Sequence, residues 1–593
     1  MDLKMQTNVM KLLRRLSEPS KAVETVIPFA PQKRFVKESA VASPLARTTP
    51  EKKGIPSSHI AAFVNELIGD PTLHFHNLLI ACEGEVIFEG SFGDHRPDIP
   101  HAVYSQSKTV TALAIGMLVD DGLLSLDEKI VKIFEKKVTP LSQLSHKEMT
   151  VEHLLTMSSG ALFNELGAVT ETDWLKAFLQ TAVLSEPGKL FAYNSMNSYV
   201  LAEIVKEKTG KTLGDFLDRR LFAPLGIDDY YWEKSPTGSE KGGWGLYIMP
   251  EDMAKIGCLF ANGGLWQGKR IVSEEWIARS VRAHKKTPAS YGRYDYGYHL
   301  WVSREENSYL FNGFFGQNLL VYPDNGIVIA TNAAFCELFQ QSNYYAIADR
   351  YFGRAFQRCA PLRASHDQRK LRLLAKTMDR PSEPDRLTRL FRTREREELL
   401  DFLDGRLYRF SSPQSARVGL MPLVAQIFQN NYTQGISAIA FAAENGQLFA
   451  DVTESGKTQR IGIGFERAVY TPIDFNGETY ECAVRGRLMR NEDDLPLLKL
   501  DLSYTENASA RQIRFVFENE TVRASFTESP DESFVFAFVD FFAGEMLNKK
   551  VTEFLSSASD GNFLTNIKHK GKQIFAPVLT GQLVKSGEDR DQQ

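Results

Sequence analysis

A serine and a lysine stand at the start of one nearly uninterrupted apolar run. The segment from His101 reads HAVYSQSKTVTALAIGMLV, with Ser105 and Lys108 three residues apart. A helix that is apolar on nearly all sides is buried, and residues three apart on a helix lie on one face. The segment therefore predicts a buried helix that ends near Gly122, with the Ser105 hydroxyl and the Lys108 amine within reach of each other.

A buried amine in this position has two interpretations. If burial keeps Lys108 neutral, its amine can take the proton of the Ser105 hydroxyl and make that oxygen a nucleophile. Alternatively, Ser105 caps the helix and Lys108 extends its side chain toward solvent. Both interpretations stay open on this segment alone, because Ser-x-x-Lys occurs by chance in a chain of 593 residues.

The length and composition narrow the class of protein. A chain of 593 residues is too long for one hydrophobic core, so we expect several domains. Its net charge of −4 gives no excess of positive charge that would attract nucleic acid or anionic lipid. The five cysteines are far apart and form no Cys-x-x-Cys pair, which argues against a disulfide framework or a zinc site. No signal-type or 18-residue apolar segment occurs. We therefore expect a cytoplasmic protein that acts on a small molecule or short peptide, with no nucleic-acid or membrane partner.

Two further segments carry candidate functional residues. Tyr193-Asn194-Ser195 leads into an amphipathic helix that ends at Gly210, so Tyr193 is held just before a helix start. The segment 312–317, Asn-Gly-Phe-Phe-Gly-Gln, precedes two strands, 318–322 and 327–331, that hairpin residues join. Glycines beside a strand allow a ligand or another backbone to approach closely.

Taken in order, Ser105-Gln-Ser-Lys108, Tyr193-Asn-Ser195 and Phe314-Phe-Gly316-Gln317 resemble the serine β-lactamase and penicillin-binding-protein superfamily, nearest its class C β-lactamase and esterase-like branch. The resemblance covers about residues 50–355, just over half of the chain. It implies an α+β fold of the β-lactamase/transpeptidase type, in which helices flank an antiparallel sheet and an all-helical subdomain is added.

The resemblance also implies roles for these residues. Ser105 is the expected nucleophile, Lys108 its base or proton shuttle, and Tyr193 the partner that relays the proton to the leaving group. The backbone N–H groups of Ser105 and Gln317 are the expected oxyanion hole. The expected substrate-binding residues are Ser195, Phe314, Phe315 and Gly316. The implied reaction is acyl transfer through an acyl-enzyme, with no metal and no cofactor.

Two departures from the family pattern bear on the substrate. Relatives of this branch carry Tyr-x-Asn where this chain has Tyr193-Asn194-Ser195, and Lys-Thr-Gly where it has a segment ending at Gly316. Phe314 stands where the family lysine pairs with a carboxylate, and it offers apolar surface instead. We expect an esterase or amidase with an uncharged or apolar acyl substrate. A D-amino-acid peptidase or β-lactamase, and a non-catalytic binding protein of the same fold, are the alternatives.

The chain divides, by this interpretation, into four parts. They are an N-terminal arm (1–46), the serine hydrolase domain (47–358), a charged helical linker (359–405) and a β-rich domain (406–593). Short strands with regular turn signals in the last part predict an antiparallel sheet or small barrel, which resembles a lipocalin-like domain in pattern. It carries no catalytic constellation, and we expect it to cover the active-site mouth, narrow substrate choice or form a homo-oligomer.

Overall fold

The computed structural model describes residues 7–9, 11–12, 15–16, 21–32, 43–378, 386–546 and 574–585. The chain forms two compact units, one of residues 1–9 and 37–380 and the other of residues 10–36 and 381–593. The boundary falls inside the expected linker 359–405, and the first helix of that segment, α15 (His366–Met378), packs on α2 (Ser57–Gly69) within the first unit. Part of the arm 1–46 lies outside the described residues.

The first unit is built on a seven-stranded antiparallel sheet with the strand order β2-β1-β12-β11-β10-β9-β8. Its strands are β1 (Phe75–Cys82), β2 (Glu85–Ser91), β8 (Tyr294–Tyr296), β9 (Trp301–Ser303), β10 (Tyr309–Gly313), β11 (Gln317–Tyr322) and β12 (Ile327–Ala333). The predicted hairpin β11–β12 is present, and β1 and β2 form a second hairpin. All residues of β1, β11 and β12 are buried, so both faces of the sheet centre are covered.

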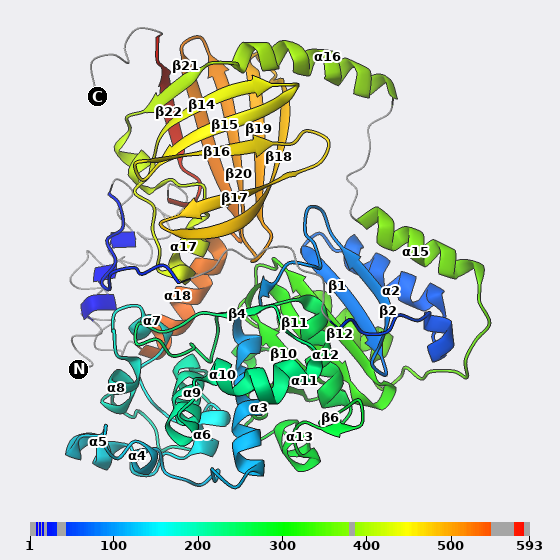
Figure 1. Ribbon diagram of the computed structural model, residues 1–593, viewed down its shortest axis with the longest axis vertical. Coiled ribbons are helices and arrows are strands. Elements are labelled where there is room, and N and C mark those ends of the chain that lie inside the picture. Colours follow the sequence, from blue (N-terminus) through cyan, green and yellow to red (C-terminus); the bar gives the residue numbers. More distant parts are fainter. Residues whose placement is uncertain are drawn as a thin grey trace. The chain divides into compact units, whose positions relative to one another are not determined.

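Helices cover the two faces. Leu319 of β11 contacts α12 (Pro250–Ala261) at Gly257, whereas Tyr322, three residues on, packs on Phe352 of α14 (Asn343–Phe352). Side chains alternate along a strand, so α12 and α14 lie on opposite faces. Helix α2 packs beside α14 and α15, and Figure 1 shows α2 next to α15.

The expected all-helical subdomain surrounds the helix that follows Ser105. Helix α3 (Ser107–Asp120) is buried from Ser107 to Leu118 and packs on α9 (Ser195–Thr209), and Gly122 at its end has φ +70°. Helices α6 (Val151–Leu155), α8 (Trp174–Leu179) and α10 (Leu213–Leu217) pack on this pair. The same unit also contains α4 (Ile130–Ile133), α5 (Pro140–Ser145), α7 (Glu165–Ala168), α11 (Ala223–Leu225) and α13 (Glu274–Ser280). The strand before α3, β3 (His101–Ala102), belongs to a small sheet in which it pairs with β5 (Leu246–Ile248), and β5 pairs with β4 (Tyr230–Trp232).

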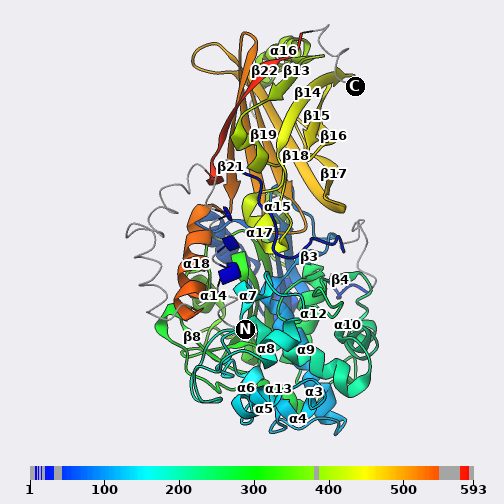
Figure 2. The same ribbon diagram turned by 90° about the vertical axis from the view of Figure 1, so that its left-hand side faces the viewer.

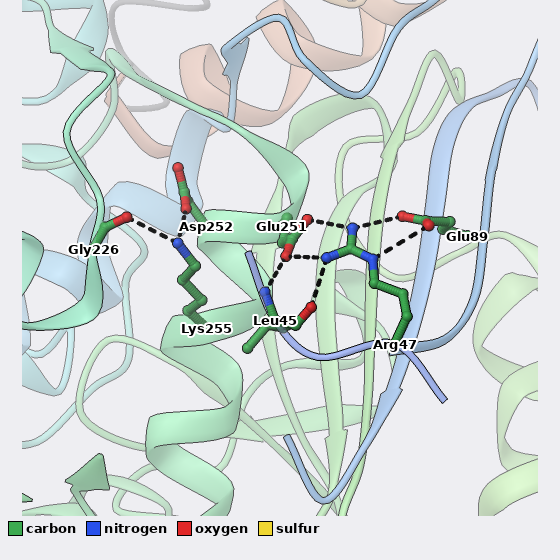
Figure 3. Close-up of polar contacts among 7 residues, drawn as sticks. All are labelled: Leu45, Arg47, Glu89, Gly226, Glu251, Asp252 and Lys255. Atoms are coloured by element: carbon green, nitrogen blue, oxygen red, sulfur yellow. Dashed lines mark hydrogen bonds and ion pairs between the residues drawn. The ribbon is translucent and has the colours of Figure 1, made fainter. Parts of the chain in front are cut away.

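Arg47 ties the segment before η1 (Pro50–Lys53) to the first turn of α12. Its guanidinium donates to both oxygens of Glu251, at 2.7 and 2.6 Å, and to Glu89 at 2.9 Å, and Glu251 also accepts the Leu45 N–H (Figure 3). Bidentate pairs of this kind are strong and directional. These hydrogen bonds fasten residues 45–47 to α12 and to β2.

A second charged pair of α12 lies entirely inside the unit. Lys255 Nζ lies 2.7 Å from Asp252 Oδ1 and donates to the carbonyl oxygen of Gly226 at 3.0 Å (Figure 3). The side chains of Lys255 and Asp252 are 0% and 3% exposed. Burial raises the pKa of Asp252 to about 6, although Lys255 opposes that shift.

The second unit is a ten-stranded antiparallel sheet, as the strand pattern predicted. Its strands are β13 (Leu407–Phe410), β14 (Ile436–Glu444), β15 (Gln447–Glu454), β16 (Lys457–Ile463), β17 (Val469–Phe475), β18 (Glu478–Arg490), β19 (Pro496–Tyr504), β20 (Ala510–Glu518), β21 (Thr521–Ser529) and β22 (Val578–Leu583). Figures 1 and 2 show the strands curling round a common interior. The Gln459 side chain exchanges hydrogen bonds with the Asp474 backbone and so bridges edge strands β16 and β17.

Apolar side chains fill the interior of this near-closed sheet. They include Phe441, Leu500 and Phe515, and the cavity that remains holds at most about one water molecule. Among the described residues of this unit, the longer helices are α16 (Arg386–Leu403), α17 (Leu423–Gln429) and α18 (Glu532–Met546), and α16 packs on β14 and β18. Over the described parts of both units, no helix has the length and apolar character needed to cross a membrane.

Candidate active site

Ser105 lies on a short 3-10 turn, Tyr104–Gln106, that runs directly into α3. Ser107 Oγ donates to the Tyr104 carbonyl at 2.6 Å and accepts the N–H of Leu246 in β5 at 3.3 Å. Tyr104 has φ +46°, a left-handed conformation that costs a non-glycine residue roughly 1–2 kcal/mol. The surrounding contacts therefore hold the backbone before Ser105 in a conformation that an isolated chain avoids.

Lys108 is buried beside Ser105, as the spacing predicted. Its Nζ lies 2.8 Å from Ser105 Oγ and donates to the carbonyl oxygen of Gly243, also at 2.8 Å. Only 1% of Lys108 is exposed, and Ser105 caps no helix amide, since the residue at the cap position of α3 is Gln106. The interpretation with a capping serine and a lysine extended to solvent is thus excluded.

Burial sets the protonation of Lys108. Loss of hydration lowers the pKa of its amine to about 7, and the negative charge of Glu165 acts in the opposite direction. Near neutral pH much of the Lys108 population is therefore uncharged and has a lone pair for the Ser105 proton.

Tyr193 joins the same pair from the segment before α9. Its ring centroid lies 4.7 Å from Lys108 Nζ, and its hydroxyl is hydrogen-bonded with Ser105. Burial raises the pKa of Tyr193 well above its usual range, and the Ser105 hydrogen bond offsets this only in part. The phenol is therefore neutral, and it can pass a proton along without first becoming a free phenolate.

Aromatic side chains fix the ring of Tyr193. Trp301 of β9 stacks on it at 5.8 Å, and Phe339 meets it in a T-shaped contact at 5.6 Å. The Tyr291 hydroxyl accepts the Tyr193 N–H at 3.4 Å. Since each neighbour constrains either the ring or the backbone, the hydroxyl is held toward Ser105.

Ser195, the expected substrate-binding residue, is the first residue of α9 and lies close to the site. It packs against Gly243, whose carbonyl binds Lys108, because a Cβ at Gly243 would come within 2.9 Å of the Ser195 Cβ. The neighbouring Asn194 does not replace the missing family asparagine. Its side chain accepts the Met196 N–H as the helix cap and donates to two backbone carbonyls, those of Ala161 and Phe163.

The segment Phe314–Gln317 does not have the geometry that the predicted oxyanion donor at Gln317 requires. The Gln317 N–H donates to the Phe314 carbonyl across the turn Phe314–Gly316, and the Gln317 side chain is buried and bonded to Ala333. Gly316 lies against the ring of Phe335. The expectation that Gln317 supplies an oxyanion donor does not fit this geometry, because its amide hydrogen already has a partner.

Gly313, at the end of β10, is the glycine that meets the turn Tyr104–Gln106, which carries the expected nucleophile Ser105 (the nucleophile turn). A Cβ at this position would overlap the carbonyl oxygen of Val103, two residues before Ser105. The sequence carries glycines at both 313 and 316, and local pattern alone does not say which of them approaches Ser105. Of the two phenylalanines between them, Phe314 is half-buried, whereas Phe315 is buried and packs on Tyr104 at 5.1 Å.

Glu165, which sequence reasoning missed, also belongs to the site. Its Oε1 accepts the Ser195 N–H at 2.7 Å, and its charge acts on both Lys108 and Tyr193. Acidic residues are common in the first turn of a helix, so the sequence contains no signal that separates Glu165 from an ordinary helix start.

The part of the chain that carries this site is similar to known proteins. Residues 77–347 match the family model described as Beta-lactamase. The 6-aminohexanoate-dimer hydrolase of Paenarthrobacter ureafaciens is 25% identical over 279 residues, which cover 42% of this chain and 70% of that protein. Penicillin-binding protein 4* of Bacillus subtilis is 22% identical over 210 residues, covering 30% of this chain and 45% of that protein.

Esterase EstB of Burkholderia gladioli is 28% identical over 178 residues, covering 26% of this chain and 45% of that protein. The crystal structure of a family VIII carboxylesterase aligns with a TM-score of 0.43 and 18% identity, over 52% of this chain and 98% of that one. Most of these names are those of hydrolases. Residues 77–347 are thus a domain of the serine β-lactamase and penicillin-binding-protein superfamily.

Proposed function

We propose that this protein is a serine hydrolase that cleaves an ester or amide through an acyl-enzyme on Ser105. The observation that carries the proposal is the 2.8 Å contact between Lys108 Nζ and Ser105 Oγ, in a buried site where the Tyr193 hydroxyl bonds to the same serine. A nucleophile, a base of lowered pKa and a proton relay are the groups that acyl transfer needs.

The proton transfers balance with these three side chains. Ser105 Oγ attacks the carbonyl carbon of the substrate while Lys108 takes the serine proton. The bond to the leaving oxygen or nitrogen then breaks, and Tyr193 passes a proton to that atom and receives one from Lys108. Water attacks the acyl-enzyme along the reverse route, which releases the acid and restores Ser105.

The oxyanion of the tetrahedral intermediate, in this proposal, lies between the backbone N–H groups of Ser105 and Phe314. Gly313 supports this placement, since it brings the end of β10 against the segment that leads into Ser105. Two such donors stabilise the developing charge, and losing one typically costs about 10²–10³ in rate.

The third segment also bears on substrate choice. If Gly313 is aligned with the glycine of the family motif Lys-Thr-Gly, the matching residues of this chain are Phe311-Asn312-Gly313. Phe311 then takes the position of the family lysine. Phe311 is fully buried, and Phe314 adds a half-buried aromatic ring beside the site. A phenylalanine does not pair with a carboxylate, which supports an uncharged or apolar acyl group. Esterase and hydrolase names among the relatives agree with this class.

Intact-protein mass spectrometry after exposure to a fluorophosphonate, p-nitrophenyl butyrate and a penicillin tests the proposal. We expect a phosphonyl adduct on Ser105, turnover of the ester and no lasting penicilloyl adduct, with Ser105→Ala as the unreactive control. A penicilloyl adduct that turns over would indicate the β-lactamase or peptidase alternative. No adduct from any reagent would contradict the proposal and indicate a non-catalytic binding protein.

A further inference from the structure

The two carboxylate oxygens of Glu165 have different surroundings. Oε1 accepts the N–H of Ser195, the first amide of α9, at 2.7 Å. Oε2 is buried and has no hydrogen-bond partner among the residues that the structure describes. A buried carboxylate oxygen without a partner is costly, and each such group in a native structure calls for an explanation. Glu165 therefore holds the residue that starts α9, and its charge acts on the pKa values of both Lys108 and Tyr193.

Lys108 faces titratable groups from three other parts of the unit. They are Tyr193 before α9, His299 before β9 and Glu165 of α7. Burial keeps the first two neutral, because it raises the pKa of Tyr193 well above its usual range and lowers the pKa of His299 to about 3.

The other acidic groups on the helices packed against α3 are engaged elsewhere or exposed. Glu203 of α9 accepts the Tyr199 hydroxyl at 3.0 Å, and Asp215 of α10 is exposed. The charge that the Lys108 amine meets inside the site is therefore that of Glu165.

We propose that Glu165 is a positioning residue of the Ser105 site, which anchors the start of α9 and sets the pH range in which Lys108 accepts the serine proton. The inference rests on the proposed function, since it takes Lys108 as the base. Burial alone favours a neutral amine and thereby weakens it as a proton acceptor. The Glu165 charge stabilises the protonated form, and it keeps Lys108 a stronger base near neutral pH, where general bases are most effective.

The test compares Glu165→Gln with the wild type. Glutamine keeps an oxygen that can accept the Ser195 N–H but removes the charge. The rate of fluorophosphonate labelling of Ser105 is followed by intact mass across a pH range that spans neutrality. Removing the negative charge makes Lys108 lose its proton more readily, so the acidic limb of the profile should move to lower pH, by about one pH unit.

Glu171→Gln is the matched control. Glu171 follows α7 in the chain and also has a buried carboxylate oxygen without a hydrogen-bond partner among the described residues, but its charge is not among those acting on Lys108. We expect its profile to match that of the wild type. A Glu165→Asp variant keeps the charge, so the pH at which its labelling rate is half-maximal should stay near that of the wild type. Its side chain is shorter, which can slow labelling equally at every pH.

The outcomes separate the two proposals. Wild-type protein that is not labelled at Ser105 at any pH would contradict the proposed function. Wild-type protein that is labelled, together with a Glu165→Gln midpoint that does not move, would overturn the role of Glu165 and leave the proposed function standing. A uniform loss of rate without a shift would show that Glu165 serves only to hold α9.

Discussion

The backbone of Gly313 lies directly against that of Val103, with no room for a side chain between them. This contact joins the end of β10 to the segment that carries Ser105, although 210 residues separate Gly313 from Val103 in the sequence. The sheet and the nucleophile turn therefore meet backbone to backbone, which is the arrangement that two oxyanion donors from different segments require.

Gly313→Ala should reduce kcat/KM for ester hydrolysis by about 10²-fold, because the added methyl group forces β10 away from the nucleophile turn. The residue has φ −124°, so alanine is not strained by its own backbone. Gly69→Ala is the control, since a Cβ at Gly69 has no atom within 4 Å. Full activity in a folded Gly313→Ala protein would show that the contact does not matter to the reaction.

Acylation of Ser105 should rise with pH through about 7, because the rate follows the neutral fraction of Lys108, whose pKa burial lowers to about that value. Lys108→Arg should abolish labelling at every accessible pH, since a guanidinium does not give up its proton. The labelling rate measured as a function of pH checks both statements. A flat wild-type profile would exclude Lys108 as the base.

Tyr193→Phe should lower turnover by about 10²–10⁴-fold, the usual contribution of a positioned proton donor. The ring contacts with Trp301 and Phe339 can remain, so the thermal unfolding temperature should change little. Tyr309→Phe, at the other end of β10 from Gly313, serves as the control for loss of a buried hydroxyl. Equal effects of the two substitutions on turnover would argue against a relay role for Tyr193.

Lys255→Ala should destabilise the first unit by about 3–5 kcal/mol, because it leaves the buried Asp252 carboxylate without its partner. The loss should be smaller below about pH 6, where Asp252, whose pKa burial raises to about 6, becomes protonated and neutral. Urea unfolding at two pH values measures the effect, with the exposed Lys269→Ala as the control. A loss that does not depend on pH would mean that packing, and not charge, dominates.

Local pattern in the sequence was enough to predict the elements that short-range forces determine. The helix after Lys108, the helix that follows Tyr193 and ends at Gly210, the hairpin of 318–322 and 327–331, and the short strands of the second unit all formed as expected. Each depends on side-chain periodicity or on a backbone preference within a few residues. The contact between Ser105 and Lys108 belongs to the same class, since it spans only three positions.

Only the tertiary structure decided which distant groups meet. It placed Gly313, and not Gly316, against the nucleophile turn, put Glu165 where its charge acts on Lys108, and divided the segment 359–405 between two units. The reason is physical. A helix or hairpin satisfies hydrogen bonds between neighbours in sequence, whereas the juxtaposition of a strand end, a helix cap and a buried amine depends on how the layers pack. The sequence by itself therefore determined the Ser105–Lys108 pair that we propose as nucleophile and base, and packing decided which groups surround it.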